Sequence, residues 1–256
     1  MLATYVPPIK TELSFDEATR AMVNALAVQL GQTPEVNVLA LALAKTALET
    51  GRWRSMWCSN WGNIKAGARH EGLYTCITLN EVLGQRVVWF APEGELNRKG
   101  GDVIGTRHEV PPGHPQTRMR AYQDPFYGAL EYIDFVATGR YRDAWAELLQ
   151  GDALAYVHAL KLKGYFTADE AKYGRAVLSL QREFIAKLED RPAPEMQTPE
   201  PEEIHSLIAA QPFNADEVRA LTRALDDARN LTRQSRDAQM AIDPTDDPPD
   251  EGDPVA

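Results

Sequence analysis

The sequence has 256 residues, 44% of them hydrophobic, which is enough for one large domain with a buried core. Residues 1–189 carry 21 acidic and 21 basic residues, whereas residues 190–256 carry 16 acidic and 6 basic ones, so the whole net charge of -10 lies at the C-terminal end. This distribution excludes a nucleic-acid partner, because phosphate binding needs a basic stripe, and no apolar run approaches the roughly 20 residues of a membrane-spanning helix.

Two helices are predicted at the start of the chain. Ser14 and Glu17 have the spacing of a capping box, which predicts a helix from there to Gly31. A second helix is predicted with Pro34 at its first position and Gly51 as its stop. Its apolar middle, VLALALA, predicts that this helix is buried all round.

A β-hairpin and a long loop are predicted next. Residues 72–90, GLYTCITLNEVLGQRVVWF, predict two strands with Tyr74 and Cys76 on alternating positions of the first, and with Gly84 in the turn. Residues 91–117 are dense in glycine and proline and show no hydrophobic period. We therefore predict a long loop there, of the kind that usually borders a site.

Helices return in the second half of the body. Asp124 and Pro125 begin one, and Asp152 caps another. Thr167 and Glu170 have the spacing of a second capping box, which predicts the start of a third. The fold class is therefore mainly α (α+β): a helical domain with a small β-hairpin lobe.

The domain organisation follows from composition. The folded body is predicted over residues 1–189, followed by a Pro-rich linker at 190–201. Residues 202–240 contain one polar helix whose thin apolar stripe suits docking on a partner; a solvated tail is the alternative. Residues 241–256 are an acidic tail that is disordered by composition.

One segment, ALETGRWRSMWCSNWGNIKAG at residues 47–67, has an unusual composition around Glu49. Glu49 falls in the last turn of the second predicted helix, where the exposed carbonyls disfavour a negative charge. Burial beside tryptophans acts in the same direction, so a raised pKa is predicted for Glu49. A protonated carboxyl group can protonate the leaving oxygen of a glycosidic bond. The alternative is an ordinary solvated glutamate at a helix end.

Three tryptophans, Trp53, Trp57 and Trp61, recur every four residues in this segment. That period is typical of the core stripe of a following helix. Tryptophan faces also stack on sugar rings, while asparagine amides bind hydroxyl and acetamide groups. The spacing leaves both interpretations open.

No cofactor and no metal are predicted. The five histidines show none of the spacings of HExxH or CxxC metal sites. Cys58 and Cys76 are the only cysteines, so no disulfide framework can be derived. We expect two buried thiols, with a single bridge as the alternative in an oxidising compartment.

Three segments, in chain order, resemble motifs of glycoside hydrolase family 73, bacterial glucosaminidases related to the flagellar peptidoglycan hydrolases. ALETGRWRS with SNWGNIKAG is similar to the family's ALESGWG with NNLFGIKA. RMRAYQDPFYGALEYIDFV is similar to FRVYDSYEESIEDYVNFL, and GYFTADEAKYGRAVLSLQREF to GYATDPNYADKLISII. The resemblance covers about residues 35–188 and departs from the family at Arg52 and in the loop at 91–117. It implies a lysozyme-like domain that cleaves the peptidoglycan glycan strand.

The resemblance also implies roles for individual residues. It makes Glu49 the catalytic acid and Glu81, just before the hairpin turn, the second carboxylate. Glu81 would activate water, or the substrate's acetamide would act instead; a merely solvated Glu81 is a further alternative. The substrate-binding residues that it implies are Asn60, Lys65, Tyr165 and Tyr173. Trp53 and Trp61, which lie beside them in the sequence, are further substrate-binding candidates because tryptophan faces stack on sugar rings. Tyr173 has an alternative as a packing residue of its helix.

The substrate partner follows from the same resemblance, whereas the attachment role follows from composition and the route to the wall from the missing signal-peptide pattern. Peptidoglycan is the expected partner, and a phage particle or a secretion or flagellar assembly is expected to engage residues 202–240. Since no signal-peptide pattern begins the sequence, we expect synthesis in the cytoplasm and action at the cell wall in the periplasm. One route to the wall would be as a component of a virion. The rivals are a lytic transglycosylase, whose usual ESxF and GLMQ motifs are missing, and an inactive wall-binding or virion structural protein.

Overall fold

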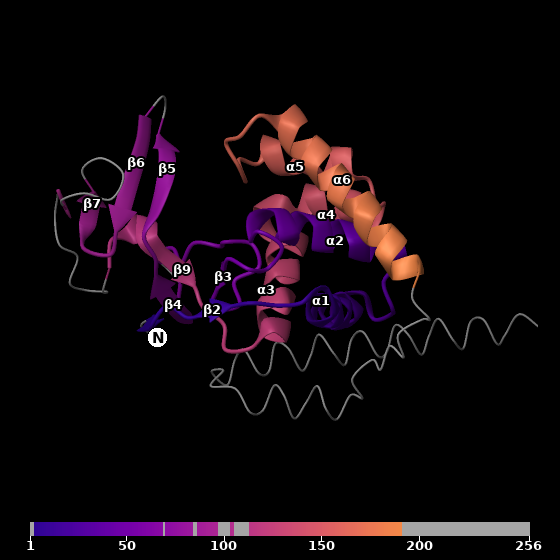
Figure 1. The fold of residues 1–256 in the computed structure, drawn as a ribbon, viewed down its shortest axis with the longest axis horizontal. Helices are drawn as coiled ribbons and strands as arrows, with labels where there is room; N and C mark the ends of the chain where they lie inside the picture. Colours follow the sequence, from indigo (N-terminus) through magenta and orange to yellow (C-terminus); the bar gives the residue numbers. More distant parts are fainter. Residues whose placement is uncertain (1–2, 69, 84–85, 97–102, 105–112, 191–256) are drawn as a thin grey trace, which may run out of the picture. The chain divides into compact units, whose positions relative to one another are not determined.

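The computed structural model describes residues 3–68, 70–83, 86–96, 103–104 and 113–190 (Figure 1). Nearly all of them belong to one compact unit, Met1–Gln29 with Thr33–Thr198. The second unit, Leu30–Gln32 with Pro199–Ala256, lies almost wholly outside the described residues. The predicted attachment helix, the acidic tail and all of the predicted linker after residue 190 lie outside the described residues, as does the hairpin turn at Gly84.

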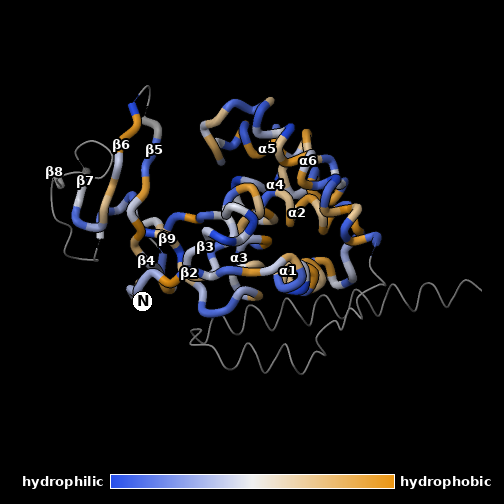
Figure 2. The backbone as a smooth tube through the Cα atoms, in the orientation of Figure 1, coloured by the Kyte–Doolittle hydropathy of each residue, from blue (hydrophilic) through white to orange (hydrophobic). Residues whose placement is uncertain are grey.

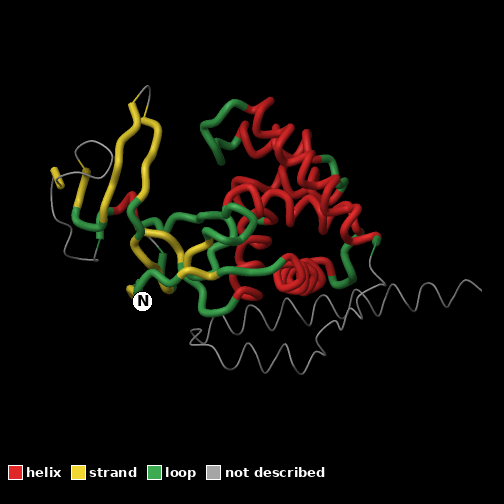
Figure 3. Tube along the Cα trace, in the orientation of Figure 1, coloured by secondary structure: helices red, strands yellow, loops and turns green. Residues whose placement is uncertain are grey.

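Helices make up most of the described fold. They are α1 (Phe15–Leu30), α2 (Val36–Glu49), α3 (Pro125–Ala137), α4 (Arg142–Leu149), α5 (Ala153–Leu162) and α6 (Glu170–Glu189), with the 3-10 turns η1 (Pro115–Thr117) and η2 (Gly139–Tyr141). The helix α2 packs against α4 and α6, and α5 packs against α4 and α6 as well (Figure 1). Figure 3 shows these helices gathered on one side of the unit and most strands on the other. The predicted mainly α (α+β) class is confirmed.

Side-chain caps begin three of the helices as predicted. Glu17 accepts the backbone N–H of Ser14 at 2.7 Å, and the Ser14 hydroxyl accepts that of Glu17 at 3.2 Å. The carboxylate of Asp124 caps α3 through Phe126 N at 2.7 Å. Asp152 caps α5 through two backbone N–H groups. These bonds satisfy donors that have no partner inside a helix.

Two predicted helix starts are wrong. The helix α2 begins at Val36, with Glu35 in extended conformation at the N-cap, so Pro34 lies outside it. The cap of α6 is Asp169, whose carboxylate accepts Lys172 N at 2.7 Å, instead of Thr167. A carboxylate accepts a stronger hydrogen bond than a hydroxyl, which explains the shift by two residues.

The strands form three small sheets. A three-stranded sheet joins β1 (Thr4–Tyr5), β4 (Leu73–Cys76) and β9 (Arg118–Arg120); a pair joins β2 (Lys10–Thr11) and β3 (Met56–Trp57); and an antiparallel meander joins β5 (Leu79–Leu83), β6 (Arg86–Ala91), β7 (Gly94–Leu96) and β8 (Val103–Ile104). In the three-stranded sheet β4 is parallel to β1 and antiparallel to β9, with Thr75 opposite Met119. In the meander, Glu81 of β5 lies opposite Val88 of β6.

The predicted hairpin is confirmed as β5–β6, but its extent is corrected. Tyr74 and Cys76 belong to β4 in another sheet, because the chain leaves β4 where Ile77 N bonds to Thr117 O at 3.1 Å. The predicted loop at 91–117 is also wrong in part, and its residues 97–102 and 105–112 lie outside the described residues. Residues 94–96 pair with the second edge of β6, which would otherwise leave its backbone groups without partners.

The core is built around α2. Residues 38–47 of this helix are all buried, as its apolar sequence predicts, and Figure 2 shows hydrophobic stretches gathered among the helices. The thiols of Cys58 and Cys76 are reduced and buried, as expected. Across the described residues, no helix combines the length and the apolar character needed to cross a bilayer.

Candidate active site

Glu49 ends α2, and two side chains hold its carboxylate. Lys45, one turn earlier, donates from Nζ to Oε1 at 2.9 Å. The hydroxyl of Tyr173 on α6 donates to the same oxygen. The side chain of Glu49 is 20% exposed and that of Lys45 is 0% exposed, so the carboxylate meets solvent on one side and is bound by protein on the other.

The predicted rise in the pKa of Glu49 is wrong. Burial does oppose ionisation, but the positive charge of Lys45 and the hydrogen bonds from Tyr173 and Lys45 outweigh it. Together they hold the pKa of Glu49 below its usual range. The carboxylate is therefore ionised in the unliganded protein.

Lys45 is a site residue that the sequence analysis missed. Burial lowers the pKa of its ammonium group, while the charge and the hydrogen bond of Glu49 act in the opposite direction. Its Nζ lies 4.0 Å from the centroid of the Tyr165 ring and 5.9 Å from that of Tyr173. A signal existed: Lys45 is the only other charged residue of α2, four positions before Glu49, and residues with this spacing share a helix face.

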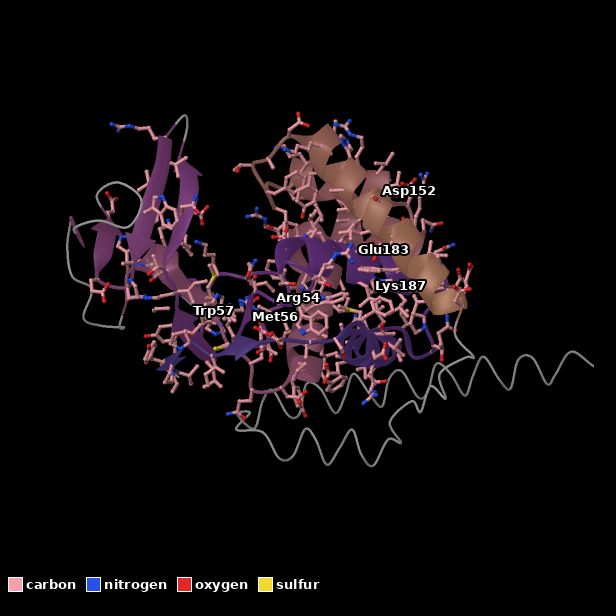
Figure 4. All side chains as sticks on the ribbon, in the orientation of Figure 1. Arg54, Met56, Trp57, Asp152, Glu183 and Lys187 are labelled. Carbon is pink, nitrogen blue, oxygen red and sulfur yellow. The ribbon has the colours of Figure 1, made fainter. Side chains whose placement is uncertain are left out.

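The chain after α2 folds back over the end of that helix and does not form the helix that the tryptophan spacing would allow. Figure 4 labels Arg54, Met56 and Trp57 in this segment. Asn63 donates from Nδ2 to the backbone carbonyl of Glu49 at 2.9 Å. A backbone with positive φ is uncommon outside glycine and concentrates at functional sites. Five non-glycine residues of the segment adopt it: Arg52, Trp53, Cys58, Ser59 and Asn63.

Two of the predicted sugar-binding residues, Trp53 and Trp61, are core residues. Trp53 is 2% exposed and Trp61 is 0% exposed. The indole N–H of Trp53 donates to Thr46 Oγ1 at 3.2 Å, and that of Trp61 donates to Pro125 O at 2.8 Å. Protein covers both indoles in this structure, and their part in substrate binding stays a prediction. Trp53 and Trp61 thus agree with the core interpretation, whereas Trp57 is only half-buried.

Asn60 is likewise internal, at 1% exposure. Its Nδ2 donates to Ile64 O at 2.9 Å and to Arg120 O at 3.0 Å, and its Oδ1 accepts Ile64 N at 2.8 Å. All three of these hydrogen bonds go to backbone groups, and a contact of Asn60 with substrate stays a prediction. This amide instead closes a turn and ties it to β9.

Tyr165 binds the segment that follows α2. It lies between α5 and α6, and its hydroxyl donates to Gly62 O at 3.0 Å. A Cβ atom on Gly62 would lie 2.9 Å from that hydroxyl and 2.8 Å from the ring of Tyr132, so only glycine allows this approach. Tyr165 thus ties the segment after α2 to the connection between α5 and α6, while its contact with a ligand stays a prediction.

Glu81 and Lys65, both site predictions, form an ion pair. Lys65 Nζ lies 2.6 Å from Glu81 Oε1, and each side chain is 37% exposed. The same ammonium donates to Gln116 O at 2.6 Å. The ion pair connects β5 to the segment after α2, whose Asn63 binds the carbonyl of Glu49.

Arg52 binds the segment after α2 to α6. Its guanidinium donates two hydrogen bonds to the carboxylate of Glu183, at 2.8 and 2.6 Å. Lys187 bonds to the same carboxylate, and Figure 4 shows Glu183 and Lys187 together on α6. The bonds from Arg52 and Lys187 lower the pKa of Glu183 to about 2. This contact helps to fix α6, and with it Tyr173, relative to α2.

Comparisons with known proteins give structural similarities only. No protein-family model and no curated protein matches the sequence. A crystal structure of a peptidoglycan hydrolase mutant from Sphingomonas sp. A1 is similar, with 20% sequence identity and a TM-score of 0.46 over 67% of this chain and 95% of the other. A C-terminally truncated glycoside hydrolase domain from Salmonella typhimurium FlgJ is similar with 18% identity and a TM-score of 0.40, over 67% of this chain and 97% of the other.

Proposed function

We propose that this chain is a peptidoglycan hydrolase, an endo-β-N-acetylglucosaminidase that acts at the cell wall, with Glu49 as its general acid. The observation that carries the proposal is that two segments distant in the sequence contact each other, at the carboxylate of Glu49 and at Gly62. Tyr173 reaches Glu49 across 124 residues, and Tyr165 reaches Gly62 across 103 residues. These contacts join two of the segments whose sequences resemble the glucosaminidase motifs, residues 47–67 and 164–184. Convergence of that kind supports a common site.

Glu49 has to gain a proton before it can donate one to the glycosidic oxygen. A glycan lying over the exposed part of its side chain would remove water from the carboxylate, and desolvation is the effect that raises its pKa. Substrate binding therefore favours protonation. The proton then passes to the leaving oxygen as the C–O bond breaks.

Products identify the reaction. Purified Gram-negative sacculi are incubated with the full chain, and the released fragments are analysed by mass spectrometry. Reducing N-acetylglucosamine ends support the proposal. Anhydro-muramic ends would instead make the chain a lytic transglycosylase, and binding without release would make it a wall-binding protein.

We propose Glu81 as the carboxylate that activates water. Glu81→Gln is expected to slow sacculus cleavage by about 100-fold or more, because a lost general base typically costs 10²–10⁴ in rate. Clearing is followed by turbidity, with a thermal melt for each protein.

Lys65→Met is the matched control for Glu81. It breaks the 2.6 Å ion pair but keeps the carboxylate, so it separates chemistry from placement of β5. Equal losses in both variants would mean that the pair only positions the strand. Full activity of Glu81→Gln would favour attack by the substrate's own acetamide.

We propose that residues 202–240 attach the enzyme to a phage particle or to a secretion or flagellar assembly. A chain ending at residue 189 is expected to clear sacculi at the rate of the full chain, because Glu49 and the residues that contact it lie before that point. The two proteins are compared on isolated sacculi and in particle or assembly incorporation. A truncated chain that folds but clears more slowly would contradict the boundary at 189.

A further inference from the structure

We propose that Lys45 is a positioning residue that orients the Glu49 carboxylate and keeps it ionised in the unliganded protein, and so sets the pH range of cleavage. The part that concerns cleavage rests on the function proposed above. The part that concerns the charge of Glu49 does not.

The surroundings of Lys45 leave its charge few ways to be compensated. The side chain is 0% exposed, and water does not reach it. In the described part of the chain, its ammonium group makes one hydrogen bond, to Glu49 at 2.9 Å, and lies 4.0 Å above the Tyr165 ring. A buried ammonium without an anion is strongly unfavourable, so the charges of Lys45 and Glu49 depend on each other.

The pair is poorly placed for a purely structural role. Within a helix, a glutamate four residues before a lysine is the favourable order, and here the order is reversed. Glu49 also lies at the C-terminal end of α2, where the helix dipole disfavours a negative charge. Apolar residues of similar volume often replace a buried ion pair without loss of stability. The arrangement therefore favours a role in the chemistry of Glu49.

The other titratable groups that face Glu49 are phenols. Tyr173 of α6, Tyr165 before α6 and Tyr156 of α5 all have pKa values raised by burial and by the negative charge of Glu49. They stay neutral through the acidic and neutral range. Among the described residues, the positive charge that acts on Glu49 is that of Lys45.

Two variants test the proposal. Lys45→Met removes the charge and the hydrogen bond, and Lys45→Gln removes the charge but keeps a donor. The protonation of Glu49 is followed by NMR in protein with ¹³C-labelled glutamate carboxyls, and the signal is assigned by its loss in Glu49→Gln. Both variants are expected to raise the titration midpoint of Glu49 by about 1–3 pH units, the usual effect of losing an opposite charge at this distance.

The pH profile of sacculus cleavage gives a second readout. Raising the pKa of Glu49 extends its protonated form to higher pH, so the alkaline limb of kcat/KM should move upward with the NMR midpoint. An unchanged midpoint in a folded variant would overturn the proposal, and so would failure of both variants to fold by circular dichroism, since Lys45 would then be structural. If the wild-type chain cleaves no sacculi, the proposed function fails, whereas the NMR midpoint still decides the role of Lys45.

Discussion

Glu49→Gln is expected to reduce sacculus clearing by about 100-fold to 10,000-fold, which corresponds to roughly 3–5 kcal/mol in the activation barrier. Glutamine has the shape of glutamate, and its carbonyl oxygen can still accept the hydrogen bonds of Lys45 and Tyr173. It has no proton of suitable acidity for the leaving oxygen. Initial rates of turbidity loss are measured for both proteins across the acidic and neutral range.

Glu189→Gln is the matched control, because Glu189 is exposed at the end of α6. It should clear sacculi at the wild-type rate. Since Glu49→Gln leaves the buried charge of Lys45 without a carboxylate, each variant is also melted, and rates are compared at a temperature where all three proteins are folded. A folded Glu49→Gln chain that clears sacculi as fast as wild type would remove Glu49 from the mechanism.

Gly128→Ala is expected to destabilise the fold by about 3 kcal/mol, the upper end of the usual cost of overpacking, because the contact it would create is with rigid backbone. A Cβ atom at Gly128 of α3 would lie 1.9 Å from the carbonyl oxygen of Ser59. That oxygen is part of the backbone and cannot rotate away, and the neighbouring Trp61 is itself bonded to α3 through Pro125. The helix or the segment after α2 would have to move. Thermal denaturation should show a melting temperature lower by roughly 10 °C.

Gly67→Ala provides the comparison for Gly128. A Cβ atom at Gly67 would meet no atom within 4 Å, so the change should stay within about 0.5 kcal/mol of wild type. If Gly128→Ala melts like Gly67→Ala, α3 does not pack against Ser59 as described. A destabilised but folded Gly128→Ala chain is also expected to cleave more slowly, since the segment it displaces contacts Glu49 through Asn63.

Local features were predictable from the sequence. The capping box of Ser14 and Glu17 and the cap at Asp152 join groups only two or three residues apart, so their hydrogen bonds depend on little else. The apolar run of α2 required burial wherever the helix packed. The position of Glu49 at the end of α2 follows from Gly51, which has a positive φ of 58°.

The charge state of Glu49 was decided by the tertiary structure. The sequence placed Lys45 and Glu49 on one helix face, but it could not show that Tyr173, 124 residues away, binds the same oxygen. Desolvation and an opposite charge shift a pKa in opposite directions. Only the final distances and burial determine which effect is larger.

The roles of the tryptophans were decided in the same way. Their spacing by four residues has the period of a helix, but the sequence alone left a core stripe and a sugar-binding surface both open. In the fold, the bonds from Asn60 to Arg120 and from Asn63 to Glu49 stabilise left-handed backbone instead, and Trp61 turns into the core. Sequence determines interactions between neighbours in the chain, whereas bonds between distant segments exist only once the chain has folded, and they can override a local preference of a few kcal/mol.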